Sequence, residues 1–171
     1  MVAPVSEGHV VDLRSPTPDT QDPTPATFRI APATAGDLPA IFALLERCEL
    51  PRAGLAAHVA HALVARADGV VVGCVALELY GRVALLRSLA VEPTWRRRGL
   101  GRDLVQAVLT AAHAARVTRV YLLTDTAEAF FARFGFERVA RERVDPAVLV
   151  SEEFTHACPQ TTPVMRKVLR S

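Results

Sequence analysis

The sequence predicts a mixed α/β domain, and two patterns along the chain support that fold class. Three strand-like runs follow one another between residues 62 and 91, as in an antiparallel β-meander. Beyond residue 91, strand-like and helix-like runs alternate in the order β-α-β-α-β. A repeat protein or a β-sandwich would not combine these patterns, so the 171-residue chain is expected to hold one α/β domain.

Residues 1–27 differ in composition from the rest of the chain. They are rich in Pro, Thr and Asp and have few large apolar side chains. Such a segment buries too little surface to offset the chain entropy lost on ordering. We therefore expect residues 1–27 to form a disordered tail, with a role as a binding peptide left open, and residues 28–171 to form a single domain.

Periodicity and turn signals place the elements of this domain. Asp68-Gly69 is a strong hairpin signal, and Leu104, Val105 and Val108 share one face of a helix. Gly135 is the expected C-cap of a later short helix. In chain order we expect a strand at 28–30, a helix capped at 34–39, a short helix at 55–61, strands at 62–67, 70–80 and 83–91, a helix at 103–116, a strand at 119–124, a short helix at 127–134, a strand at 136–143, helical turns at 146–154 and a strand at 163–169.

Charge and cysteine usage limit the class of partner and the compartment. The formal net charge is only +2, which does not favour a general nucleic-acid binder. Cys48, Cys74 and Cys158 are odd in number, far apart and form no CxxC pair, so a reducing compartment is expected. No apolar run reaches the ~18 residues of a membrane span, and no secretory signal pattern is present. We therefore expect a cytoplasmic protein with neither membrane nor nucleic-acid partners.

Residues 96–101, Arg-Arg-Arg-Gly-Leu-Gly, are the most informative stretch of the chain. They join a strand-like run to a helix start. Glycines allow successive backbone N–H groups to converge on one point, and the helix start adds unpaired donors and partial positive charge. The arginines add cationic donors. This combination predicts a site for a phosphorylated ligand, and an exposed basic loop with a tight turn is the alternative.

Two common phosphate motifs do not fit this turn. A P-loop needs Gly-x-x-x-x-Gly-Lys-Ser/Thr, and the chain contains no such run. A dinucleotide-binding turn needs a third glycine, where this chain has Leu104, and an acidic residue ~20 positions on, where the region around Arg119 is basic. What remains is a turn that holds a pyrophosphate through its backbone.

Several motifs in sequence order extend this interpretation. They are the strand run 85–91, the turn 95–101, the amphipathic helix, the strand Tyr-Leu-Leu-Thr at 121–124 and the Phe-Phe-Ala-Arg-Phe-Gly-Phe run at 130–136. Together they resemble the GCN5-related N-acetyltransferase (GNAT) superfamily, over residues 28–169. The resemblance implies an α/β fold with a mixed central sheet, a splayed strand pair and flanking helices. It also implies acetyl-CoA as donor and no metal.

Three further segments resemble a narrower group. These are residues 73–78, 86–91 and the tail 153–167, which are similar to the small acetyltransferases encoded with arsenic-resistance genes. They are also similar to short amino-acid N-acetyltransferases of the N-acetylglutamate synthase type. This resemblance implies a small, amino-acid-like acceptor and a role in detoxification or resistance.

The superfamily resemblance implies residues for the donor. The backbone of residues 97–101 would hold the pyrophosphate, with Arg96 at the first position of the motif. The pantetheine arm would pair with the strand edge at Leu89 and Val91, and a main-chain N–H near Leu89 would stabilise the developing oxyanion. The full expected donor set is Leu89, Ala90, Val91, Arg96, Arg97, Arg98, Gly99, Leu100, Gly101, Arg102, Thr124 and Phe131.

Proton transfer and acceptor binding need further groups. An α-amine titrates near ~8 and must lose a proton, for which Glu78 is the first candidate base and Glu92 the second. Glu78 as a solvated strand-end carboxylate is the alternative. Phe131 stands where many relatives have a Tyr acid, so water would protonate the thiolate. Arg87, and secondarily Arg52, are candidates to bind a substrate carboxylate, with ordinary salt bridges as the alternative.

Three functions remain open at this point. The first is an N-acetyltransferase for a small amine, the second is a protein or peptide N-acetyltransferase, and the third is a non-catalytic acyl-CoA-binding regulatory module. The expected partner is a small-molecule amine acceptor, with a homodimer left open. His58 and His61 lie three residues apart but have no visible third ligand, so no metal site is expected.

Overall fold

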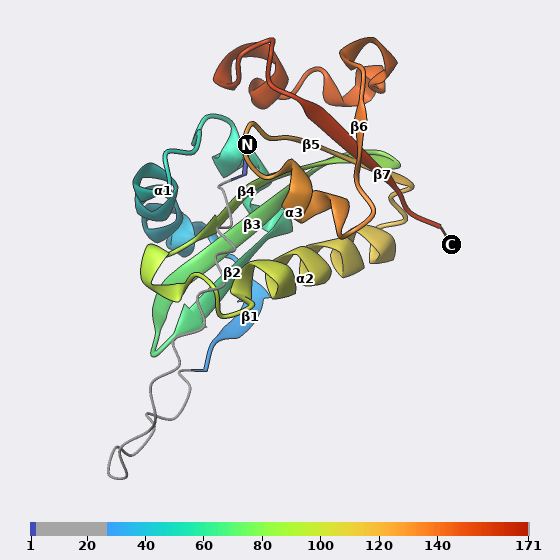
Figure 1. The fold of residues 1–171 in the computed structure, drawn as a ribbon. Coiled ribbons are helices and arrows are strands. Elements are labelled where there is room, and N and C mark those ends of the chain that lie inside the picture. Colours follow the sequence, from blue (N-terminus) through green and yellow to red (C-terminus); the bar gives the residue numbers. More distant parts are fainter. Residues whose placement is uncertain (3–26, 171) are drawn as a thin grey trace, which may run out of the picture.

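A seven-stranded sheet organises the molecule in the order β1-β2-β3-β4-β5-β7-β6 (Figure 1). The computed structural model describes residues 1–2 and 27–170. The expected tail, apart from residues 1, 2 and 27, lies outside these described residues, and the division into tail and single domain stays a prediction. The strands are β1 (Arg29–Pro32), β2 (Ala62–Ala67), β3 (Val70–Tyr80), β4 (Val83–Val91), β5 (Arg119–Leu123), β6 (Glu137–Val139) and β7 (Val164–Val168).

Helices cover both faces of this sheet. The α-helices are α1 (Leu38–Arg47), α2 (Leu100–Ala114) and α3 (Glu128–Ala132). Helix α2 packs Leu104, Val105 and Val108 into one buried apolar cluster. Helix α1 packs Ile41 and Leu44 into another cluster on the opposite face. The expected α/β class, with a mixed sheet and flanking helices, is therefore confirmed.

Most expected boundaries are confirmed, and two are corrected. The short helix expected at 55–61 has these bounds and is a 3-10 helix, Leu55–His61. Helix α2 begins at Leu100 rather than Asp103, because Gly99 is its N-cap in the left-handed conformation (φ 80°). The strand expected at 136–143 extends only over Glu137–Val139 and is followed by short 3-10 turns at Arg141–Arg143 and Pro146–Val148. A π-helical turn, Glu153–Ala157, precedes β7.

Strand β4 contains a bulge at the centre of the sheet. Arg87 pairs with Ala76 and Ala90 pairs with Cys74, so two residues of β4 lie opposite one residue of β3. Ser88 takes a left-handed conformation there, with φ 58°. The extra residue changes which side chains face α2, from even-numbered positions before the bulge to odd-numbered positions after it.

Strands β4 and β5 are parallel, and they pair over a short stretch. The pairing runs from Val83 opposite Arg119 to Leu85 opposite Tyr121. Within the described sheet, β4 then continues to Val91 without β5 beside it, which confirms the expected splayed strand pair. The edge of β4 beyond the bulge is therefore left with backbone groups that another partner can use.

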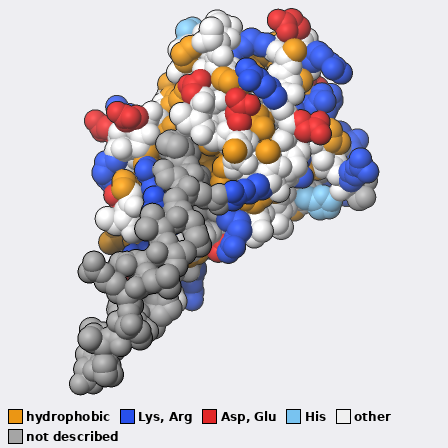
Figure 2. Space-filling model, viewed as in Figure 1, with side chains coloured by type: hydrophobic (Ala, Val, Ile, Leu, Met, Phe, Trp, Pro, Cys, Tyr) orange, Lys and Arg blue, Asp and Glu red, His pale blue; other side chains and the backbone are white. Residues whose placement is uncertain are grey.

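The surface shows no separation of charge on the face seen in Figure 2. Acidic and basic side chains are interspersed there. Among the helices of residues 27–170, none has the length and apolar character required of a membrane-spanning helix.

Gly73 allows α2 to approach β3 closely. A Cβ atom at this position would lie 3.0 Å from Leu104 Cδ1 and 3.2 Å from Leu100 Cδ2. Gly73→Ala should therefore displace the start of α2 and lower the free energy of unfolding by about 1–3 kcal/mol. Chemical denaturation would measure this loss.

Gly36→Ala is the matched control, because an added Cβ there meets only Thr34 Oγ1 at 3.6 Å. Equal stability of the two variants would contradict close packing at Gly73.

Candidate active site

The unpaired edge of β4 is occupied by the beginning of the chain. The Ser88 N–H donates to the Met1 carbonyl oxygen at 3.2 Å. Val2 is 2% exposed and belongs to the apolar cluster that contains Leu89, Val91 and Leu100. Residues 1–2 therefore lie along the β4 edge, a contact that no sequence signal predicted.

A fully buried guanidinium lies next to this edge. Arg87 Nη1 donates to Glu78 Oε1 at 2.7 Å, Nη2 to the Pro51 carbonyl at 3.3 Å and Nε to Ser88 Oγ at 3.1 Å. Its Nε atom also lies 3.5 Å from Glu153 Oε1. The sequence-predicted pair Glu78 and Arg87 is thus brought together, and both side chains are buried.

Glu78 already has partners for both carboxylate oxygens. Tyr80 donates its hydroxyl to Oε2 at 2.5 Å, and Arg87 binds Oε1. Burial acts to raise the pKa of Glu78, but hydrogen bonds from Tyr80, Arg87 and Ser151 outweigh burial and hold the pKa below its usual value. A carboxylate stabilised in this way is a weak base, and its proposed role as general base stays a prediction.

Glu153 is the carboxylate to which sequence reasoning gave no role. It begins the π-helical turn and is fully buried. Its Oε2 lies 2.5 Å from the Met1 α-amino nitrogen. Its Oε1 has no hydrogen-bond partner among the described residues. Glu153 opens the tail motif at 153–159, but nothing in that motif shows that it reaches β4, because the contact depends on the fold.

Two residues of the glycine turn take the left-handed conformation, and its role as a phosphate cradle stays a prediction. Arg97 and Gly99 both take left-handed conformations, with φ 65° and 80°. Arg98 lies over the Trp95 ring at 4.8 Å, and Arg96 Nε donates to the Val91 carbonyl at 3.4 Å. The first N–H groups of α2 follow directly, and a helix start leaves such groups without intrahelical partners.

The remaining donor candidates have visible structural contacts. Thr124 is buried, and its Oγ1 accepts from the Ala127 N–H at 3.0 Å, at the start of α3. Phe131 is fully buried in the cluster that includes Leu89. Arg102 is exposed and pairs with Asp103. Their roles toward a donor stay predictions.

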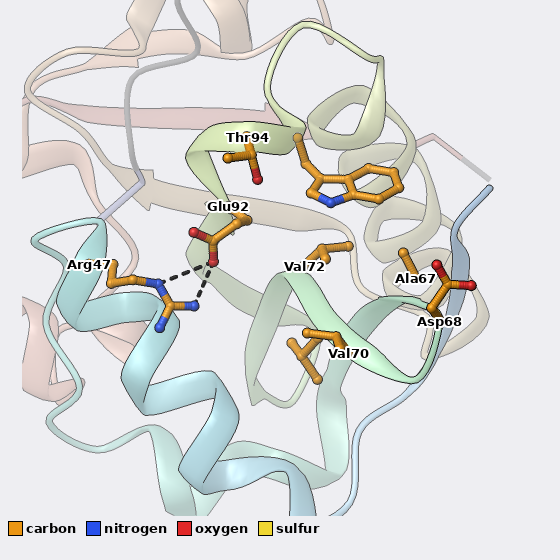
Figure 3. A pocket seen from close by; sticks show the side chains of 9 residues that line it. Arg47, Ala67, Asp68, Val70, Val72, Glu92 and Thr94 are labelled. Carbon is orange, nitrogen blue, oxygen red and sulfur yellow. Dashed lines mark hydrogen bonds and ion pairs between the residues drawn. The ribbon is translucent and has the colours of Figure 1, made fainter. Parts of the chain in front are cut away.

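Two weaker candidates lie outside the buried cluster. Arg52 is exposed, lies 4.0 Å from Glu46 and sits over the Phe42 ring. Glu92 binds Arg47 at 2.6 Å beside a pocket of about 370 Å³, which Figure 3 shows between α1 and the β2–β3 hairpin. This pocket is lined by different residues from those at the β4–β5 separation, so we give it no catalytic role.

No metal site is found in the part of the chain that the structure describes. His58 approaches Glu78 Oε2 at 3.8 Å and contacts Tyr80, instead of joining His61 in a ligand set.

The geometry defines an α/β fold in which two central parallel strands separate beside a glycine turn and a helix start.

Residues 58–138 match the family described as the acetyltransferase (GNAT) domain. The chain is 39% identical over 72 residues to an amino-acid acetyltransferase of Mycobacterium tuberculosis, covering 42% of this chain and 41% of that protein. It is 35% identical over 86 residues to an uncharacterized N-acetyltransferase of Chlorobaculum tepidum, covering 50% and 55%. The matched segment is thus about half the length of these curated relatives.

Solved structures show the same fold over more of the chain. Rv2747 from Mycobacterium tuberculosis, in complex with CoA and a second ligand, has a TM-score of 0.70 and 28% identity, covering 83% of this chain and 99% of that one. N-acetylglutamate synthase from Neisseria gonorrhoeae, complexed with coenzyme A and N-acetyl-glutamate, has a TM-score of 0.74 and 22% identity, covering 86% and 36%. These matches support membership of the GCN5-related N-acetyltransferase superfamily, with residues 58–138 as the segment that matches its domain.

The lowered pKa of Glu78 has a consequence for stability. Because the folded pKa lies below the usual 4.5, the ionised form stabilises the fold above that pH, and this contribution is lost as pH falls through the folded pKa. Glu78→Gln should lower stability at neutral pH and make the fall in unfolding free energy between about pH 5 and 3 shallower than in the wild type. Denaturation at a series of pH values measures both effects.

The exposed Glu142→Gln is the control and should keep the wild-type pH profile. An unchanged acid slope in Glu78→Gln would show that Glu78 is not stabilised by this cluster.

Proposed function

We propose that the chain is an acetyl-CoA-dependent N-acetyltransferase that acts on the amine of a small, amino-acid-like acceptor. The observation that carries this proposal is that β4 continues beyond its pairing with β5, between the glycine turn and a buried cluster that contacts the Met1 amine. One end suits a pyrophosphate, and the other end holds the Met1 amino group against Glu153. The similarity to an amino-acid acetyltransferase supports the same class of acceptor.

The chain's residues would act on the donor through backbone groups. The N–H groups of residues 97–101, with the arginines beside them, would bind the pyrophosphate. The β4 edge at Leu89 and Val91 would hold the pantetheine arm in extended form. The N–H groups of Ser88 and Leu89, at the bulge, would donate to the thioester oxygen as negative charge develops on it. Acetyl-CoA supplies an activated acyl group and a thiolate that leaves without strong acid help.

The acceptor is proposed to enter at the opposite end of the edge. The buried cluster of Arg87, Glu78 and Glu153 would face the amine there, and Arg52, in the loop that holds Pro51, would be the cation left for the carboxylate. A role in detoxification or resistance is an extension of this proposal and depends on which amine is acetylated.

A peptide N-terminus is the second candidate acceptor, because residues 1–2 of this chain fit the site as a peptide N-terminus would. A thiol-release assay should compare free amino acids, including glutamate and glutamine, with peptides that begin Met-Val. Turnover on amino acids alone supports the first proposal, and turnover on peptides alone supports the second. Acetyl-CoA binding by calorimetry without turnover on any amine would favour a non-catalytic module.

The basic turn gives a direct test of donor binding. Arg98→Glu reverses a charge beside the proposed pyrophosphate site and should weaken acetyl-CoA binding by at least about 10-fold, or ~1.4 kcal/mol. The weakening should diminish at high salt, because exposed charges are screened. Isothermal titration calorimetry at two salt concentrations measures both.

Arg143→Glu makes the same charge change at an exposed position away from the turn and should leave affinity unchanged. If both variants weakened acetyl-CoA binding equally, the effect would be due to net charge alone, and the turn would be rejected as the pyrophosphate site.

Acetyl-CoA and residues 1–2 are proposed to compete for one edge of β4. Val2→Asp should prevent burial of that side chain, whose transfer to the core contributes about 1.5 kcal/mol, and so tighten acetyl-CoA binding by up to about tenfold. Calorimetry of the wild type and the variant measures the change.

Val70→Asp is the control, since Val70 is 62% exposed. Unchanged or weaker binding in Val2→Asp would show that residues 1–2 do not obstruct the donor.

A further inference from the structure

Among the described side chains, the charges of the buried cluster do not balance when both of its acids are ionised. One guanidinium, Arg87, faces two carboxylates, Glu78 and Glu153, and all three side chains are at most 1% exposed. With both acids ionised, this set carries one net negative charge. Burying an uncompensated charge is costly, so the cluster favours a bound cation. Within residues 27–170, His58 is a further basic side chain near it, and it lies 3.8 Å from Glu78.

The cation present in the structure is an amine. The Met1 α-amino group lies 2.5 Å from Glu153 Oε2, while the Met1 carbonyl accepts from the Ser88 N–H. The second oxygen of Glu153 has no hydrogen-bond partner among the described residues, although it is buried. Glu153 is thus able to receive a further donor at the point where the β4 edge meets the cluster.

We propose that Glu153 is the residue that binds the acceptor ammonium and takes its proton, and that the Met1 amino group stands in for that acceptor. The inference rests on the proposed function, and it names the residue that would bind the acceptor amine. It favours Glu153 over Glu78, whose oxygens are occupied by Tyr80 and Arg87. It also gives Arg87 a positioning role, because its guanidinium already serves both carboxylates.

The proton transfers and bond changes of the reaction balance with these groups. The ammonium gives one proton to Glu153, and the neutral nitrogen attacks the thioester carbon. The C–N bond forms, the C–S bond breaks, and the sulfur leaves with the bonding pair as a thiolate. The nitrogen loses its second proton, the thiolate gains one, and one proton is released to solvent per turnover.

Glu153→Gln tests the inference with little change of shape. The variant leaves one cation and one anion buried, Arg87 and Glu78, so the fold should be retained. We expect kcat/KM for the amine to fall by at least about 100-fold, as for loss of a general base, while acetyl-CoA binding is retained or tightened, because loss of the Met1 ion pair releases residues 1–2 from the β4 edge. Glu152→Gln is the matched control, since this neighbouring carboxylate is exposed and contacts His156.

A merely structural role would change the melting temperature of Glu153→Gln without this selective loss of amine turnover, and that result would overturn the inference. A structure of the wild-type protein with CoA and glutamate is the second measurement, and it does not depend on how the variant folds. The amino nitrogen should lie within about 3.2 Å of a Glu153 oxygen, with Met1 displaced. A nitrogen bound elsewhere would contradict the inference.

The two proposals fail in different ways. Absence of wild-type turnover on every amine would reject the proposed function. Wild-type turnover that Glu153→Gln leaves unchanged would reject only the role of Glu153.

Discussion

The separation of β4 from β5 after Leu85 is the constraint on which the candidate site depends. If β4 and β5 were paired along their whole length, β4 would have no buried edge without a neighbouring strand. Here β4 carries a bulge at Ser88 and continues to Val91, while its pairing with β5 ends at Leu85, so that among the described residues no strand pairs with this edge beyond the bulge. Buried backbone groups require hydrogen-bond partners, and Met1 supplies one of them here by accepting from the Ser88 N–H.

Strand β4 also carries a buried charged side chain, which requires partners of opposite charge. Arg87, at an odd-numbered position before the bulge, points away from α2 and toward Glu78 and Glu153, and all three side chains are buried. A buried ion cluster contributes little net stability to a fold. Its presence here is therefore better explained by a function than by stability. A site that binds an amine beside an N–H donor to a thioester oxygen provides such a reason. Stability and chemistry would then depend on the same three side chains.

Local signals in the sequence were sufficient for much of the fold and for part of the site. The bounds of β2, β3 and β4 follow from alternation and from the Asp68-Gly69 turn, and the glycine turn was found from its residues. Glu153 could not be found this way, because its partner Met1 is 152 residues away. The early start of α2 also escaped prediction, since it depends on the conformation of Gly99.

The most direct measurement is a crystal structure of the protein with acetyl-CoA. If the β4 edge is the donor site, the pantetheine arm will be hydrogen-bonded to Leu89 or Val91, its phosphates will contact the backbone of residues 97–101, and the Ser88 N–H will have exchanged Met1 for the ligand. A coenzyme bound elsewhere, with Met1 still on Ser88 and the turn free of phosphate, would contradict the central claim.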